Sequence, residues 1–387
     1  MQVAFYRHDL KPSDADKIAK VLATPILTSG AVGKSVEAQL SEFFSTKYAG
    51  LCNSWTNGAL AALLAMDIGP GDEVIVPAMT FISSANIVEI LGARPVFVDV
   101  APDTLLISLE ALRVAVTPAT KAVIPVHLYG QMVDLRQVRA VLAGMGRADI
   151  KVIEDAAHCF EGRFEDYGPG KHSDIAIFSF YATKNIACGE GGAFVTDSED
   201  LYVKLMQTRL HGMSAGAVDR YQKGSYRHWD MERLGTKANL PDLLAALLPD
   251  QIATIRGRLP VRQELAVRYE NGFRDTPIRM ALVRESAHSA RHIFPIHVAP
   301  ALRDECIAIL NAAGIGVAVN FRSVPNTSYY RKKYGYTPGD FPVSYDWGEG
   351  EITLPLFPSM TREEQDYVIA VVRDKIAPML GGNDKLR

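Results

Sequence analysis

One lysine, Lys184, lies in a stretch where a solvated charge is unusual. It follows the apolar β-type run 174–180 (DIAIFSF), and a glycine turn and a second β-type run, 193–196, come after it. Burial disfavours the ammonium form and therefore lowers the pKa of a lysine. A desolvated lysine is a nucleophile that forms a Schiff base with a carbonyl cofactor. The alternative, a surface lysine in a β-hairpin, stays open at this point.

Two acidic residues end another apolar run. The run 151–154 is predicted to be a strand that leads into Asp155, and small residues and His158 follow. A carboxylate at a strand end keeps a pyridine nitrogen protonated, which makes the ring an electron sink. Asp155 is equally suited to capping the next turn. His158 is suited either to proton transfer beside the lysine or to a structural hydrogen bond.

Small polar residues precede an apolar helix predicted over 59–66. Ser54, Thr56 and the backbone of Trp55 form a candidate phosphate cup, because free N–H groups at a helix start bind anions. Ser179 is a further hydroxyl donor. Helix capping without a ligand is the alternative for these residues.

Two aromatic residues complete the candidate set. Phe81 is suited to lie flat on an aromatic ring, and Tyr181 is suited to donate or accept a proton beside Lys184. A core phenylalanine and a structural hydroxyl group are the alternatives.

Composition excludes several classes of protein. The chain has 387 residues, enough for a large domain and a smaller one, and its net charge of -3 gives no argument for nucleic acid or membrane binding. No apolar run reaches the roughly 20 residues that span a bilayer, and the N-terminus does not resemble a signal peptide. Four scattered cysteines, without a CxxC pair or histidines at metal spacing, predict a reduced cytoplasmic chain without a metal site.

Strands and helices alternate over about two hundred residues. Strands are predicted over 72–76, 94–100, 122–126, 151–154 and 174–180, and helices over 82–91, 108–116 and 134–143. Such alternation predicts βαβ units and a mostly parallel sheet covered by helices. Ligands gather beyond the carboxyl ends of parallel strands. We therefore expect Thr56, Asp155 and Lys184 to share one pocket.

The chain divides into three predicted parts. Residues 1–30 are an N-terminal arm, 31–255 a large cofactor-binding domain and 256–387 a small C-terminal α/β domain. Further predicted elements are a helix over 239–255 with a bend at Pro249, a helix over 260–273, and strands over 292–298 and 316–321.

The order of these motifs resembles the DegT/DnrJ/EryC1/StrS family of pyridoxal phosphate (PLP)-dependent sugar aminotransferases. The matching stretches are NSWT (53–56), GPGDEVIVPAMTF (69–81), KAVIPVHLYGQMVD (121–134), VIEDAAH (152–158), FSFYATKN and GEGG (178–192), LGTKANLPDLLAAL (234–247), GIGVAVNFR (314–322) and LPLFPSMT (354–361). The resemblance covers nearly the whole chain. It implies the α/β fold type I of aspartate aminotransferase, with a mostly parallel seven-stranded sheet flanked by helices and a smaller C-terminal α/β domain.

The resemblance implies a role for each candidate. Lys184 matches the lysine that carries PLP and later moves a proton, Asp155 the acid on the pyridine nitrogen, and His158 the neighbour of the phenolic oxygen. Phe81 matches the stacking ring. Ser54, Thr56, Ser179 and the backbone of Trp55 match the phosphate ligands. Tyr181 occupies a position near the sugar.

Asn239 matches an asparagine that reaches the phosphate from the other subunit, which implies a homodimer with shared active sites. Trp55 stands where small residues are usual, so either the cup is wider or the indole fills substrate space. Asn320 lies where relatives often carry a substrate-site histidine. Lys223, Arg227 and His228 are candidate partners for the substrate's phosphates, with a solvated loop face as the alternative.

The implied function is transfer of an amino group from L-glutamate to a nucleotide-linked keto sugar, most readily at C4. The product would serve cell-surface polysaccharide, lipopolysaccharide or related amino-sugar biosynthesis. A non-catalytic or regulatory member of the family is one alternative. A PLP-dependent sugar dehydratase is another, but that branch has a histidine in place of the lysine, and Lys184 argues against it.

Overall fold

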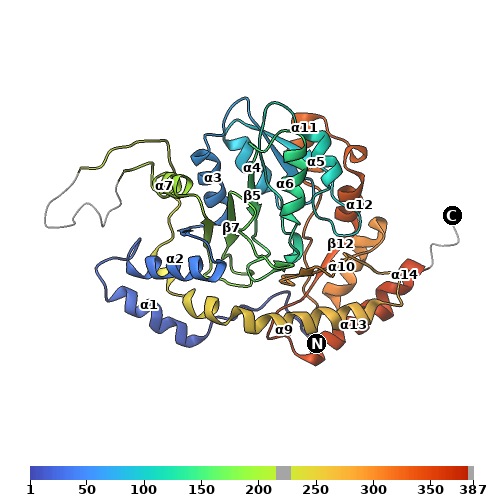
Figure 1. The fold of residues 1–387 in the computed structure, drawn as a ribbon. Helices are drawn as coiled ribbons and strands as arrows, with labels where there is room; N and C mark the ends of the chain where they lie inside the picture. The colour runs from blue at the N-terminus through green and yellow to red at the C-terminus, as the bar shows by residue number, and fades with distance from the viewer. Residues whose placement is uncertain (215–227, 382–387) are drawn as a thin grey trace.

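The structure, a computed structural model, describes residues 1–214 and 228–381 and is built around one large sheet (Figure 1). The sheet has seven strands in the order β1-β8-β7-β5-β4-β2-β3. Their bounds are β1 (Tyr48–Cys52), β2 (Glu73–Pro77), β3 (Arg94–Val98), β4 (Thr120–Val123), β5 (Lys151–Asp155), β7 (Ile175–Ser179) and β8 (Gly192–Thr196). Only the pairings of β8 are antiparallel. The predicted mostly parallel, seven-stranded sheet is confirmed.

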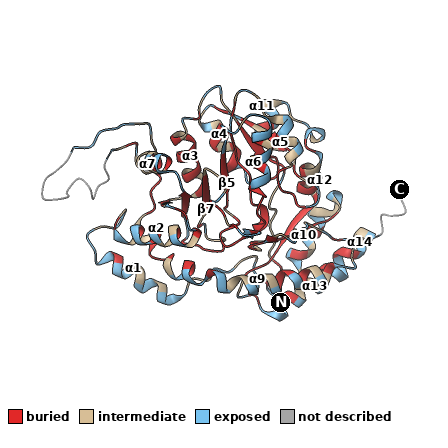
Figure 2. Ribbon diagram, in the orientation of Figure 1, coloured by how far each residue is buried: buried red, intermediate tan, exposed pale blue. Residues whose placement is uncertain are grey.

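Helices cover both faces of this sheet, because its strands are apolar on both faces. Val74 and Val76 of β2 pack in the core with the helices α3 (Trp55–Ala65), α4 (Ser83–Ile90) and α7 (Glu199–Thr208). Ile75 points the other way and packs with α5 (Leu109–Ala115) and α6 (Leu135–Gly144). Alternate residues of a strand face opposite sides, so β2 contributes to two cores. Figure 2 shows the buried strands between helices whose outer faces are exposed.

A smaller antiparallel sheet lies in the C-terminal part of the chain. It has the order β12-β11-β9, with β9 (Arg279–Met280), β11 (Phe294–His297) and β12 (Glu351–Leu354). The helices of this part are α10 (Arg303–Ala312), α11 (Ser328–Tyr334), α12 (Pro342–Gly350), α13 (Arg362–Val371) and α14 (Ala377–Gly381). The two short strands β6 (Arg163–Phe164) and β10 (Ala287–His288) pair with each other. The predicted smaller C-terminal α/β region is therefore present.

The prediction of one helix over 239–255 is wrong. The structure has a short helix α8 (Asp242–Ala245) and then a long helix α9 (Pro249–Phe273), which runs along the lower edge of the molecule in Figure 1. Pro249 lies in the first turn of α9, where a missing N–H costs no hydrogen bond. The proline therefore starts the second helix and does not bend a continuous one.

The predicted strand over 316–321 is also wrong. This segment makes one isolated bridge, from Ala318 to Thr353, and no ladder. The Asn320 N–H donates to the Glu351 carboxylate (2.7 Å) and not to a strand carbonyl. A side chain of the neighbouring strand thus takes the donor that a ladder would need.

The N-terminal segment is fastened to α8 by one carboxylate. Residues 1–30 contain a helix, α1 (Ala15–Leu22), and lead into α2 (Ala31–Phe44). The buried Asp242 side chain accepts the N–H groups of Gly30 (2.9 Å), Val32 (3.1 Å) and Gly33 (3.0 Å). Asp242 therefore caps α2 from a distant part of the sequence. The proposed domain boundary at 255/256 falls inside α9, and the division stays a prediction.

Two structural features of residues 1–214 and 228–381 concern membrane and metal binding. None of their helices is both long and apolar enough to cross a bilayer. No group of three or more His, Cys, Asp and Glu side chains in these ranges is arranged to hold a metal ion.

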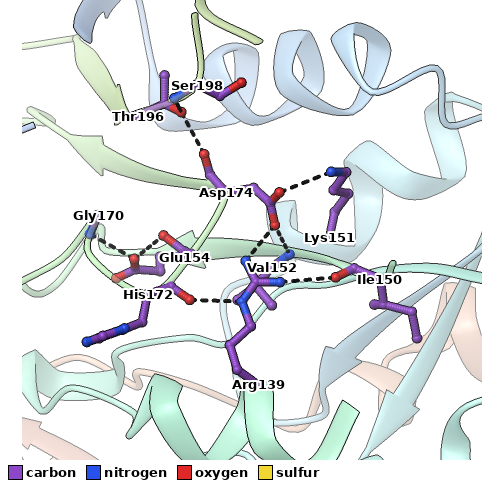
Figure 3. Close-up of polar contacts among 11 residues, drawn as sticks. Arg139, Ile150, Lys151, Val152, Glu154, Gly170, His172, Asp174, Thr196 and Ser198 are labelled. Atoms are coloured by element: carbon purple, nitrogen blue, oxygen red, sulfur yellow. Dashed lines mark hydrogen bonds and ion pairs between the residues drawn. The ribbon is translucent and has the colours of Figure 1, made fainter. Parts of the chain in front are cut away.

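A polar network fixes the start of β7 against β5 and β8 (Figure 3). The Asp174 carboxylate accepts hydrogen bonds from Arg139 (2.7 Å), Lys151 (3.2 Å) and the Val152 N–H (2.9 Å). Thr196 donates to the Asp174 carbonyl oxygen (2.7 Å). Burial alone raises the pKa of Asp174, but the hydrogen bonds from Val152 and Arg139 outweigh it and hold the pKa below its usual range. This network sets the register of β5, which ends at Asp155, and of β7, which leads into the turn of Lys184.

We expect Asp174→Ala to lower the free energy of unfolding by about 2 kcal/mol, because it leaves part-buried donors without an acceptor. The lowered pKa means that this contribution is present above the unfolded pKa and is lost as pH falls through the folded value. Urea unfolding at neutral pH and at pH 3 measures both effects. Asp304→Ala, which removes an exposed ion pair with Arg303, is the control and should change little. Equal losses in the two variants would contradict the structural role of Asp174.

Candidate active site

A cavity of about 480 Å³ opens beyond the carboxyl ends of β5 and β7. The predicted site residues on its wall are Ser54, Trp55, Thr56, Phe81, Asp155, His158, Ser179, Tyr181, Lys184 and Asn320. β5 ends at Asp155 and β7 ends at Ser179, so the parallel strands deliver both side chains to the same edge of the sheet. The expectation that Thr56, Asp155 and Lys184 share one pocket is met.

Asp155 is a buried carboxylate with few partners. Oδ2 accepts from the Ser84 hydroxyl (3.0 Å), and Oδ1 accepts from the Ala157 N–H (3.1 Å). Burial raises the pKa of Asp155, while these two hydrogen bonds and the charge of Lys184 oppose the rise. The carboxylate therefore faces the cavity in a setting where a cationic partner is strongly favoured.

Lys184 lies in a turn directly after β7. Its N–H donates to the Tyr181 carbonyl oxygen (2.9 Å), which closes the turn and directs the side chain to the cavity. Burial lowers the pKa of Lys184 from an ordinary 10.5 to about 8, and the nearby Asp155 carboxylate opposes the shift. The amine thus changes charge close to neutral pH, as a nucleophile or a proton carrier requires.

His158 forms a side wall of the cavity. Its Nδ1 accepts from the Tyr129 N–H (3.3 Å), and its ring stacks on Phe321 with centroids 5.6 Å apart. Burial, and then the charge of Lys184, lowers the pKa of His158 well below its usual value. A neutral imidazole whose Nδ1 accepts a hydrogen bond must carry its own proton on Nε2.

The start of α3 forms the other end of the cavity. Ser54 is the N-cap, and its Oγ accepts from the Asn57 N–H (3.1 Å). The first N–H groups of a helix have no partner within it and attract anions. Thr56 adds a hydroxyl group, which donates to Ser83 (3.2 Å), and Ser179 adds another. A Cβ on Gly192 would lie 2.9 Å from the Trp55 nitrogen. Only a glycine at this position therefore lets β8 lie so close to the start of α3.

The aromatic candidates differ in exposure. Phe81 is 53% exposed at the cavity wall, with its ring 5.6 Å from that of Phe321, and Tyr181 is 46% exposed. The Trp55 indole is only 6% exposed and belongs to the core cluster of α3 and α4. The indole therefore packs mainly in the core and leaves the cavity open.

Two predicted residues, Asn239 and His228, are not among the described residues that line the cavity. Asn239 is buried elsewhere: its Nδ2 donates to Ser29 (2.8 Å), and its Oδ1 has no hydrogen-bond partner among the described residues. His228 is exposed and is not among the residues that line the cavity. Lys223 and Arg227 lie outside the described residues.

Several wall residues escaped the sequence analysis, among them Ser84, His292 and Phe321. Ser84, which holds Asp155, lies inside a predicted helix without any motif of its own. His292 and Phe321 also line the cavity. They belong to segments interpreted as strands, and their distance in sequence from Lys184 left no local signal for their role.

The side chains present fit PLP. A carboxylate suits the pyridine nitrogen, an exposed phenylalanine suits the ring face, an amine of lowered pKa suits the aldehyde, and a helix N-terminus with hydroxyl groups suits the phosphate. These groups are respectively Asp155, Phe81, Lys184 and the Ser54–Thr56 segment, and all of them line one cavity.

Comparison with known proteins identifies the family. The sequence pattern of the DegT/DnrJ/EryC1/StrS aminotransferase family matches residues 8–373. The chain belongs to this family. One relative is the spore coat polysaccharide biosynthesis protein SpsC of Bacillus subtilis, which is 38% identical over 93% of this chain and 94% of its own length.

Two solved structures superpose closely on the chain. The putative sugar aminotransferase Spr1654 from Streptococcus pneumoniae in its PLP form has a TM-score of 0.89 and 28% identity, over 97% of this chain and 99% of its own. DesV of S. venezuelae has a TM-score of 0.85 and 30% identity, over 94% of each chain. The predicted family, fold type, aminotransferase class and PLP cofactor are confirmed.

We expect Lys184 of the cofactor-free protein to react with acetic anhydride with a midpoint near pH 8, because burial lowers its pKa to about 8 and only the neutral amine reacts. Labelling across pH 6–11, followed by mass spectrometry of the Lys184 peptide, measures the midpoint. The exposed Lys47 in the same sample is the internal reference. Indistinguishable profiles for the two lysines would show that Lys184 is hydrated and would contradict its assignment.

Proposed function

We propose that this aminotransferase moves an amino group from L-glutamate to the C4 keto group of a nucleotide-linked sugar, for cell-surface polysaccharide, lipopolysaccharide or related amino-sugar biosynthesis. The observation that carries the proposal is the meeting of Lys184 and Asp155 in one cavity that also contains the N-terminus of α3. The names of its relatives, a spore coat polysaccharide biosynthesis protein and a putative sugar aminotransferase, support the sugar substrate. The four free, buried cysteines agree with a reducing cytoplasm.

Each proposed cofactor residue would contact a different part of PLP. When bound, PLP acts as an electron sink for the carbon that loses its proton. Asp155 would keep the ring nitrogen protonated, and Phe81 would cover one face of the ring. Ser54, Ser179, Thr56 and the first N–H groups of α3 would hold the phosphate. His158, neutral and protonated on Nε2, would donate to the phenolic oxygen.

Lys184 would act as the general acid and base. With a pKa near 8 the free amine takes a proton from the substrate carbon and returns it to another atom without a large energetic penalty in either direction. The Asp155 carboxylate opposes complete loss of the ammonium form, so both protonation states stay accessible near neutral pH. Tyr181 and Asn320 lie on the cavity wall and are proposed sugar contacts.

A homodimer is part of the proposal. Asn239 is proposed to donate from its amide Nδ2 to the phosphate in the partner's site; within one subunit this group donates to Ser29 (2.8 Å). Met231 and Leu234, which lie just before Asn239, are 56% and 68% exposed. Neighbouring exposed apolar side chains are typical of a surface that another subunit covers.

We expect purified protein reconstituted with PLP to lose its visible cofactor absorbance on addition of L-glutamate and to release one equivalent of 2-oxoglutarate per site. Lys184→Ala should abolish this half-reaction, because the general base is removed. Lys171→Ala, on the exposed surface, is the matched control and should behave like the wild type. Wild-type protein that stays colourless with PLP would support a regulatory member of the family and overturn the enzyme assignment.

The sugar contacts are tested separately from the glutamate half-reaction. We expect Tyr181→Phe and Asn320→Ala to raise the KM for an accepted UDP- or dTDP-linked 4-keto sugar about tenfold, because each loses one hydrogen bond worth ~1.4 kcal/mol. Steady-state kinetics with a panel of these sugars, beside single-turnover rates with glutamate, separates the two steps. Equal effects on both half-reactions would place these residues at the cofactor and not at the sugar.

A further inference from the structure

A buried amide beside Lys184 links the catalytic turn to the opposite wall of the cavity. Asn185 is 7% exposed, and its Nδ2 donates to Glu161 Oε1 (2.7 Å) and to the Ala290 carbonyl oxygen (3.1 Å). Its Oδ1 lies 2.9 Å from Nδ1 of His292. All hydrogen-bonding groups of this side chain are engaged with segments far away in sequence, although its backbone is bonded directly to Lys184.

We propose that Asn185 is a positioning residue, which fixes the turn that carries Lys184 and orients His292 against His158 so that the cavity wall offers one neutral donor and one neutral acceptor. The inference rests on the roles of Lys184 and His158 in the proposed function. It does not depend on the identity of the sugar.

The hydrogen bonds determine which nitrogen of His292 carries the proton. A carbonyl oxygen can only accept, so the contact with Ala290 requires the NH₂ group of Asn185 on that side. The amide oxygen therefore faces His292, and His292 Nδ1 must be the donor. In the neutral ring this leaves a lone pair on Nε2 of His292.

His158 has the complementary form. Its Nδ1 accepts from the Tyr129 N–H (3.3 Å), so its proton is on Nε2. The two imidazole rings lie 4.5 Å apart at an angle of 42°, and both line the cavity. Burial lowers the pKa of both rings well below the usual value, and Lys184 contributes to each shift. The pair therefore stays neutral and polar beside a cation.

The two side-chain partners of Asn185, Glu161 and His292, both interact with Arg262 of α9. Glu161, which accepts from Asn185, is buried, and burial raises its pKa while Arg262 of α9 opposes the rise. Arg262 also donates to the His292 carbonyl oxygen (3.5 Å). Asn185 thus joins three separate segments, and removing its amide would free the turn of Lys184 and the ring of His292 together.

The test uses full-length protein loaded with PLP, with two readouts besides turnover. Asn185→Ala should weaken PLP retention in dialysis about tenfold, as expected for a lost buried hydrogen-bond set. It should also move the pH midpoint of the visible cofactor absorbance upward by about one unit, because water admitted beside Lys184 favours the charged form. His292→Phe, which keeps an aromatic ring but cannot bond to Asn185, should shift the same two quantities in the same direction.

The control is Gln263→Ala. Gln263 donates to the Ser289 carbonyl oxygen (2.7 Å) and accepts from Arg291 (3.0 Å), so it braces the same segment without contact to His292 or Lys184. It should lower thermal stability and leave the absorbance midpoint at the wild-type value. The proposal is overturned if Asn185→Ala and His292→Phe also keep that midpoint and the wild-type PLP retention. Wild-type protein that takes up no PLP would instead overturn the proposed function.

Discussion

The placement of an amine opposite a carboxylate in a desolvated cavity governs the architecture of this chain. Burial lowers the pKa of Lys184 and raises that of Asp155, and each group opposes the shift of the other. Neither charge is tolerable alone at this depth, since an unpaired buried ion is costly. The two side chains must therefore lie close together, although they come from different elements of the fold. The parallel strands β5 and β7 place them so, because neighbouring parallel strands end at the same edge of the sheet.

The rest of the site is arranged around that edge by close packing. Ser84 of α4 steadies Asp155, and Gly192 of β8 allows the start of α3 to lie against the strand. Farther away, Asp174 holds the opposite ends of β5 and β7 in register. The cavity chemistry thus depends on contacts at both ends of the same strands. A change in the network of Figure 3 would shift the position of Asp155 at the other end of β5.

The sequence was sufficient for the parts of the structure that follow a local rule. Asp155 and Lys184 were found because apolar runs end beside them, and the sheet because strands and helices alternate regularly. The helix over 239–255 was predicted wrongly because the apolar pattern continues across Pro249, although α8 has already ended there and α9 begins. The prediction of a strand over 316–321 was wrong because the Glu351 side chain accepts the hydrogen bond of the Asn320 N–H. The link between Asn185 and His292 spans 107 residues, and no local pattern encodes such a contact.

The capping of α2 by Asp242 has a consequence for the order in which the chain can acquire its structure. α2 begins at residue 31, but the acceptor for its first N–H groups is more than two hundred residues further on, and a side chain at Gly30 would collide with that carboxylate. During synthesis the helix therefore emerges from the ribosome long before its cap. Contacts of such large sequence separation close late and slow folding. The N-terminal segment must remain loosely held until the middle of the protein has been translated.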